Sequence, residues 1–173
     1  MKRRDFIKNT VRTAGLISIS RFPQNVFGSE KKKYANDVVT LGNTGIKISR
    51  LAMGTGSNGW EGSSDQTRKL GLKGLSDLLN HAYDRGVYFW DSADQYGSHA
   101  HLKEALKTIP REKVVILTKT RATTEEEMKS DLERFRNELG TDYLDIVLLH
   151  AITDPEWPVN KEPVMNIRDD KKE

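Results

Sequence analysis

The feature that most restricts the fold of this 173-residue sequence is a repeated pattern, in which a short apolar strand is followed by an amphipathic helix. Predicted strands begin near residues 51, 87, 114 and 144, so the pattern recurs about every 30 residues. The strands are almost continuously apolar, which is typical of parallel strands that are buried on both faces. The sequence therefore predicts an α/β fold that contains about four successive βα units.

Three helices are expected between these strands, and Leu72, Leu75 and Leu79 lie on one face of the first. This leucine stripe is expected to pack in the core. Before the first strand, a β-hairpin is predicted to turn at Asn43-Thr44-Gly45, and in a barrel it could close the bottom. The expected helices span residues 65–86, 101–109 and 123–141, and the expected hairpin spans residues 38–49.

The net charge of +3 comes from the N-terminal end of the chain rather than from its body. Residues 1–28 carry a net charge of +5, so the remaining residues carry −2. The body therefore offers no basic surface for nucleic acid. The sequence contains no cysteine, which excludes disulfides and thiolate chemistry. It also lacks an apolar run of about 18 residues, the minimum expected of a membrane-spanning helix.

Residues 1–30 are set apart by the pattern Arg3-Arg4-Asp5-Phe6-Ile7-Lys8, which precedes a short apolar stretch at residues 14–19. This pattern resembles a twin-arginine (Tat) signal, a segment that directs the export of folded proteins. The resemblance implies an exported, periplasmic location and excludes these residues from the folded domain. The alternative is a disordered basic tail on a cytoplasmic protein.

Polar or ionisable residues follow each of the four predicted strands. In parallel α/β folds the carboxyl ends of the strands meet at one edge, where binding and catalytic residues gather. An apolar strand has no structural need to end in an ionisable group, so these residues are candidates for a shared site. They are Gly54 and Thr55 after the first strand, Asp91 and then Tyr96 after the second, Lys119 after the third and His150 after the fourth.

The segments FWDSADQYG, ILTKT and IVLLH, together with the opening LGNTGIKISRLAMGTG, resemble the aldo-keto reductase family over about residues 36–158. The resemblance implies a TIM-type (β/α)8 barrel that reduces aldehydes and ketones with a nicotinamide nucleotide, usually NADPH. It implies a small carbonyl compound as substrate and no metal. The implied catalytic residues are Asp91, Tyr96, Lys119 and His150, and the implied cofactor contacts are Gly54, Thr55 and Asp91.

This chemistry accounts for the residue types. Hydride addition to a carbonyl carbon leaves negative charge on the oxygen, and a free phenol with a pKa of about 10 is a poor acid at neutral pH. A neighbouring ammonium group stabilises a phenolate, which is the role implied for Lys119 beside Tyr96. Asp91 would keep Lys119 charged and aimed. His150 would donate a hydrogen bond to the carbonyl oxygen and orient the substrate.

Other polar and aromatic residues near these segments have simpler interpretations. Asp94, His99 and His101 are expected to cap or solvate the helix that follows them. Trp60 and Trp157 either line a substrate pocket or pack in the core or a loop, and the sequence leaves both possibilities open. The glycine-rich residues 54–59 lack the G-x-G-x-x-G pattern, which excludes a Rossmann dinucleotide site.

The resemblance covers only the first half of a barrel, because a complete (β/α)8 barrel needs about 200 residues or more. The chain is therefore expected to divide into a signal-like segment (1–30), a partial reductase domain (31–158) and a truncated or disordered tail (159–173). Two hypotheses follow. The chain is either a reductase whose second half is missing or supplied by a partner, or a non-catalytic half-barrel remnant or interaction module. An isolated half-barrel would leave inward side chains such as Ile116 and Leu148 uncovered, which favours self-association.

Overall fold

The computed structural model describes residues 32–151. The chain divides into two compact units, residues 1–33 and 34–173, and nearly all described residues belong to the second. The predicted export signal, Trp157 and the C-terminal tail lie outside the described residues. Among the described residues, no helix is both long enough and apolar enough to cross a membrane.

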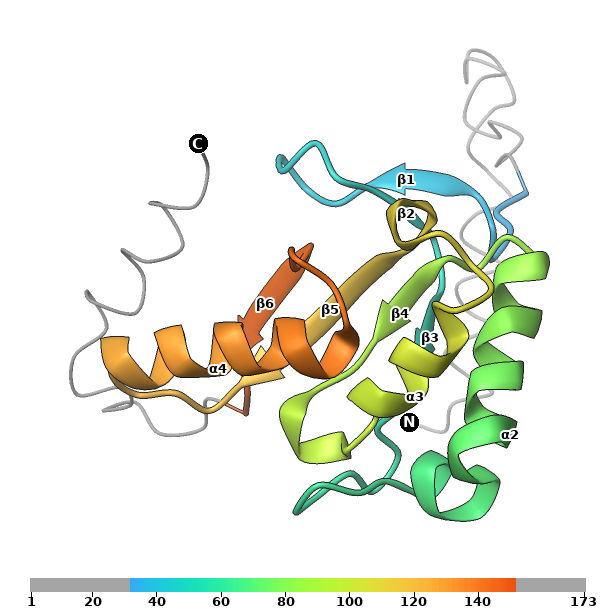
Figure 1. The fold of residues 1–173 in the computed structure, drawn as a ribbon. Coiled ribbons are helices and arrows are strands. Elements are labelled where there is room, and N and C mark those ends of the chain that lie inside the picture. The colour runs from blue at the N-terminus through green and yellow to red at the C-terminus, as the bar shows by residue number, and fades with distance from the viewer. Residues whose placement is uncertain (1–31, 152–173) are drawn as a thin grey trace, which may run out of the picture. The chain divides into compact units, whose positions relative to one another are not determined.

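A four-stranded parallel sheet organises the described part of the chain (Figure 1). The order of the strands across the sheet follows their order in the sequence, as expected for successive βα units. This arrangement confirms the predicted α/β fold with four successive parallel strands. The strands are β3 (Ala52–Gly54), β4 (Phe89–Asp91), β5 (Val115–Thr120) and β6 (Ile146–Leu149).

Helices cover one face of this sheet, and two short 3-10 turns complete the connections. Trp90 of β4 and Ile116 of β5 point toward the helices and are almost fully buried against Leu75, Leu79 and other apolar residues. This helix-facing layer is the main core. The helices are α2 (Asp65–Asp84), α3 (His99–Ala105) and α4 (Glu125–Leu139), and the turns are η2 (Asp94–Tyr96) and η3 (Arg111–Lys113).

Helix α2 departs from the predicted leucine stripe. Leu75 and Leu79 are fully buried as expected, but Leu72 is exposed, so the prediction that it packs in the core is wrong. Leu72 is the first residue after Gly71, whose φ of 63° and ψ of −176° interrupt the helix, so all three leucines belong to the regular helix that follows this kink. Their shared helical spacing therefore does not by itself bury the residue at the start of that helix.

Helix α4 forms as the sequence predicts. The side chain of Thr124 caps its first turn by accepting from the backbone N–H of Glu127, and the side chain of Glu127 accepts a hydrogen bond from the backbone N–H of Thr124. Met128, Phe135 and Leu139 are buried, and Gly140 ends the helix in a left-handed conformation with φ of 68°.

The predicted hairpin is present as β1 (Val38–Thr40) and β2 (Lys47–Ser49), which pair in antiparallel orientation. Ile48 packs against Phe89 and Leu117 on the sheet face that the helices leave open, here called the inner face. The backbone N–H of Phe89 donates to Ser49 Oγ at 3.0 Å. The hairpin therefore covers the inner face around the amino ends of the strands and leaves the carboxyl ends available.

The two side chains expected to lack an opposite layer behave differently from each other. Ile116 faces the helices and is buried, so that prediction is wrong for Ile116. Leu148 lies beside Lys119 in the strand register and is 45% exposed. Successive strand residues alternate between the two faces, and a continuously apolar strand does not reveal which set faces the helices.

Candidate active site

The carboxyl ends of β4 and β5 bring Asp91 and Lys119 together. Lys119 Nζ donates to Asp91 Oδ1 at 2.7 Å and to the backbone oxygen of Ser92 at 2.8 Å. The lysine side chain is only 14% exposed and the aspartate side chain 35% exposed. The ammonium group is therefore held in a fixed position by two acceptors, and one edge of the carboxylate remains open to solvent.

Tyr96 is delivered to this ion pair by the turn η2. Lys119 Nζ lies 5.0 Å from the centroid of the tyrosine ring. Gly97 follows with φ of 60°, and a Cβ at that position would lie 1.8 Å from the backbone oxygen of Gly62. A residue with a side chain therefore cannot occupy position 97 without moving the loop that contains Gly62.

The loop after β3 makes room for the Tyr96 ring through two glycines. A Cβ on Gly56 would lie 2.2 Å from the ring, and a Cβ on Gly59 would lie 2.3 Å from it. Any side chain at either position would displace the ring. These glycines lack the side chains that would occupy the position of the Tyr96 ring, a role that the sequence alone did not indicate.

His150 follows β6 and completes the cluster. Its backbone N–H donates to the oxygen of Thr120 at 2.7 Å, and its ring meets that of Tyr96 edge-on, with centroids 5.4 Å apart. Burial lowers the pKa of His150, and the positive charges of Lys119 and Arg121 lower it further. The imidazole is therefore neutral at neutral pH. Its buried Nδ1 atom has no hydrogen-bond partner among the described residues.

The structure thus brings Asp91, Tyr96, Lys119 and His150 to one place. The predicted cofactor contacts lie beside them. Gly54 pairs with Asp91 in the strand register, and a Cβ there would meet no atom within 4 Å, so the space next to it is open.

Thr55 is fully buried, and its hydroxyl is already engaged. It donates to the backbone oxygen of Asp91 at 2.9 Å and lies 2.8 Å from Ser98 Oγ. Ser98 Oγ also lies 2.7 Å from Ser92 Oγ. This chain of hydroxyl groups fixes the end of β4 behind Asp91, and any contact between Thr55 and a cofactor requires atoms other than its hydroxyl.

His99 and Asp94 do not cap or solvate the helix, so those two predictions are wrong. His99 is buried, with Nδ1 2.6 Å from Glu138 Oε2 and Nε2 2.8 Å from Thr118 Oγ1. Asp94 forms an ion pair with Arg134 of α4. Glu138 and Arg134 lie about forty residues away from His99 and Asp94 in the sequence, and no local sequence pattern predicts these contacts. His101 lies in the first turn of α3.

Trp60 is 56% exposed, so it is not a core residue. The guanidinium of Arg121 lies over its ring, 5.5 Å from the centroid. The two side chains join the loop after β3 to the segment after β5. Because Arg121 also acts electrostatically on His150, this pair belongs to the surroundings of the four clustered residues.

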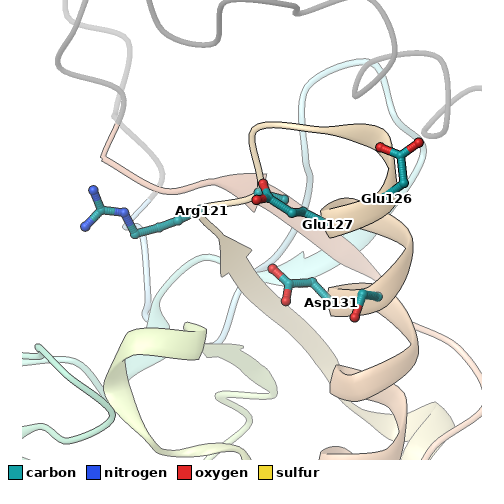
Figure 2. A pocket seen from close by; sticks show the side chains of 6 residues that line it. Arg121, Glu126, Glu127 and Asp131 are labelled. Carbon is teal, nitrogen blue, oxygen red and sulfur yellow. The ribbon is translucent and has the colours of Figure 1, made fainter.

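A hollow of about 490 Å³ lies at the start of α4 (Figure 2). Its lining includes Glu127 and Asp131, whose carboxylates bind Thr123 and Arg134 respectively. Backbone and side-chain hydrogen bonds from Thr123 lower the pKa of Glu127. Figure 2 shows Arg121 extending away from Glu127 and Asp131. The carboxylates of Glu127 and Asp131 therefore serve the first turns of α4. Within the described range 32–151, no group of three potential ligands is placed to hold a metal ion.

The family model of the Aldo/keto reductase family matches residues 50–171, which is more than half of the chain. The chain belongs to the aldo/keto reductase family. The expected TIM-type lineage is confirmed with it, because the solved structures that resemble this chain are aldo-keto reductases. This aldo/keto reductase chain presents its four clustered polar residues at the carboxyl edge of its sheet.

Named relatives support the same family. Versiconal hemiacetal acetate reductase of Aspergillus parasiticus is 42% identical over 88 residues, which is 46% of this chain and 24% of that protein. Glycerol 2-dehydrogenase (NADP(+)) of Saccharomyces cerevisiae is 29% identical over 123 residues, which is 70% of this chain and 34% of that protein. The chain thus spans about a quarter to a third of the length of these relatives.

Among solved structures, the thermostable aldo-keto reductase Tm1743 in complex with the inhibitor epalrestat superposes with a TM-score of 0.63 at 28% identity. The match covers 76% of this aldo/keto reductase chain and 48% of Tm1743. The four parallel strands of the present structure therefore correspond to about half of that solved chain.

Proposed function

We propose that this chain carries the catalytic residues of an NADPH-dependent reductase of aldehydes and ketones. The observation that carries the proposal is the joint placement of Lys119 against both Asp91 and the ring of Tyr96. A phenol beside a held ammonium group is suited to donate a proton to an oxygen on which negative charge develops.

Each residue has a separate role in the proposed reaction. The Tyr96 hydroxyl gives its proton to the carbonyl oxygen, and Lys119 stabilises the phenolate that remains. Asp91 keeps the ammonium group in position through their 2.7 Å contact. The products are the alcohol and the oxidised nucleotide, and the phenolate recovers a proton from solvent.

His150 is proposed to orient the carbonyl group. Because burial and neighbouring positive charge lower its pKa, the ring is a neutral hydrogen-bond donor rather than a competing acid. Its edge-on contact with the ring of Tyr96 supports a shared position for the carbonyl oxygen between the two residues.

The residues present fit a nicotinamide nucleotide at the edge of the sheet. When bound, the nucleotide supplies the hydride that adds to the carbonyl carbon. The open space beside Gly54 and the exposed edge of Asp91 support contacts of these two residues with it. The proposed preference for NADPH is supported by the yeast relative, whose name carries NADP(+).

The test is reduction of an aldehyde by the chain, measured as loss of NADPH absorbance, both alone and joined to the C-terminal half of a relative. Tyr96→Phe should abolish nearly all turnover and leave NADPH affinity within about twofold, because only the proton donor is lost. Tyr34→Phe is the matched control, since Tyr34 is exposed in the turn before β1. Full turnover by Tyr96→Phe would contradict the assignment.

Two observations favour the alternative that the chain is a non-catalytic half-barrel, and the same experiment tests it. Leu148 is exposed on the inner face, and the chain spans less than half of Tm1743. If neither the chain alone nor the joined form reduces any aldehyde, the half-barrel is an interaction module or a remnant. Sizing chromatography of the chain alone then measures the proposed self-association or binding of a complementing half.

The same proposal extends to location. The Arg3-Arg4 pattern supports export of the folded chain to the periplasm. Residues 1–35 fused to a reporter that folds before export should carry it across the inner membrane, and replacing both arginines by lysine should retain it. Retention of the unmutated fusion would favour the basic tail and a cytoplasmic location.

A further inference from the structure

Arg121 is a charged residue at the site that the proposed reaction does not use. It follows Lys119 by two residues at the end of β5 and is exposed. Arg111 and Arg134 bind carboxylates directly, at 2.6 and 2.7 Å. Across residues 32–151, Arg121 forms no such ion pair, and its contact is the ring of Trp60. Its positive charge is therefore uncompensated by any side chain that contacts it in the described part of the chain.

The cation–π contact with Trp60 leaves the N–H edge of the guanidinium group without an ion pair. An arginine in such a contact still presents parallel N–H groups, which match the two oxygens of a carboxylate. Arg121 extends away from Glu127 and Asp131, so these acidic side chains do not occupy that edge (Figure 2). The exposed indole ring also offers an apolar surface for the carbon skeleton of a ligand.

The same pair lies close to the proposed reacting groups. Trp60 is next in sequence to Gly59, which borders the ring of Tyr96. Arg121 acts electrostatically on His150. The other nearby charges are already paired, because Asp91 binds Lys119 and Asp94 binds Arg134. A ligand anion that approaches Tyr96 and His150 therefore meets Arg121 as the available positive charge.

We infer that Arg121, supported by Trp60, recognises a carboxylate group on the carbonyl substrate, so that the preferred substrates are oxo acids rather than neutral aldehydes. This inference rests on the proposed function. An anion in this place could instead be a phosphate of the nucleotide, which shares the same chemistry, and the two sources are separated by measuring each ligand independently.

The first arm compares two substrates that differ only in charge, 4-carboxybenzaldehyde and methyl 4-formylbenzoate, with the full chain or its joined form. Arg121→Gln should raise KM for the acid at least about tenfold, the effect of losing one charge-assisted hydrogen-bonded contact. It should leave KM for the ester and kcat for both within about twofold. Arg121→Lys should recover part of the loss, because the charge returns without the planar fork. Arg85→Gln, at the exposed end of α2, is the matched control.

The second arm does not depend on turnover. Titration of the full chain with 4-carboxybenzaldehyde should change tryptophan fluorescence through Trp60, and both Trp60→Phe and Arg121→Gln should remove or weaken that change. NADPH affinity of Arg121→Gln should equal that of the unmutated chain. Equal losses for acid and ester, or a loss of NADPH affinity, would overturn the inference. If the unmutated chain binds the acid but reduces neither compound, the reductase proposal fails and the recognition site stands.

Discussion

The carboxylate of Asp94 meets the guanidinium group of Arg134 through two hydrogen bonds, of 2.7 and 3.0 Å. This pair joins η2, the turn that ends in Tyr96, to the middle of α4. Arg134 also binds Asp131 and Glu138 of its own helix. The hydrogen bonds that Arg134 donates to Asp94, and then to the other two carboxylates, raise its pKa, so its charge is permanent. The position of Tyr96 thus depends on a helix on the other side of the sheet.

Arg134→Gln is expected to lower the free energy of unfolding by about 1 kcal/mol, because three carboxylates lose one shared partner while solvent screening limits the effect. Lys73→Gln, which removes an exposed pair on α2, should change it by less than about 0.5 kcal/mol. Urea denaturation of both variants measures the difference. A double-mutant cycle with Asp94→Asn should give a non-zero coupling energy, and strict additivity would show that the pair contributes nothing.

Gly56→Ala is expected to disturb Tyr96, because the added Cβ would lie 2.2 Å from the ring. Turnover should fall at least about tenfold, since a misplacement of about 1 Å can cost this much. Gly74→Ala in α2 serves as the control for folding, because its Cβ would approach Leu70 Cβ at 3.2 Å and not the ring of Tyr96. Near-ultraviolet circular dichroism and aldehyde reduction report the two effects. An unchanged tyrosine signal and unchanged turnover would show that the ring adapts.

His99→Ala is expected to lower the free energy of unfolding by about 2–4 kcal/mol, because it opens a cavity and leaves buried Thr118 without its partner. Glu138 and the ring of Phe135 lose contacts as well. His81→Ala, at an exposed position of α2, should change the same quantity by less than about 0.5 kcal/mol. Chemical denaturation separates them, and similar small effects would mean that the buried network is not stabilising.

Stability is expected to fall as pH drops from 8 to 5.5. The pKa of His150 in the fold lies below its ordinary value of 6.5, and that of His101 is also lowered, in both cases chiefly by burial. The unfolded chain then binds protons that the folded chain does not. The full contribution is therefore present above pH 6.5 and is lost progressively below it. His150→Asn should flatten the dependence of the melting temperature on pH in this window. An unchanged slope would assign the effect to other groups.

The clustering of Asp91 and Lys119 was predictable from the sequence, because parallel strands place their carboxyl ends at one edge whatever the details of packing. The hairpin and α4 were predictable for a similar reason, since their turn and capping residues act locally. The exposure of Leu72 was not predictable, because helical spacing shows which residues share a face but not which of them the neighbouring elements cover. The face occupied by Ile116 could not be read from a strand that is apolar throughout.

Most contacts around the four clustered polar residues could not be predicted from the sequence. His99 forms a hydrogen bond with Glu138, which lies thirty-nine residues later on another helix. Only the packing of α3 against α4 brings the two side chains together. The roles of Gly56 and Gly59 follow from the position of the Tyr96 ring, which the glycine-rich pattern does not specify. Local chemistry was therefore predictable where a strand end fixed it, and unpredictable where two distant elements had to meet.

The position of each strand in the sheet also sets how readily each part of the site opens. β4 and β5 are hydrogen-bonded on both sides, whereas β6 has one pairing partner among the described strands. Strands with fewer partners open at a lower free-energy cost, so backbone amides in β6 should exchange with solvent faster than those in β5. Asp91 and Lys119 belong to the slowly exchanging centre, and His150 belongs to the edge. On warming, the molecule would lose its means of orienting a substrate while the ion pair beneath Tyr96 is still intact.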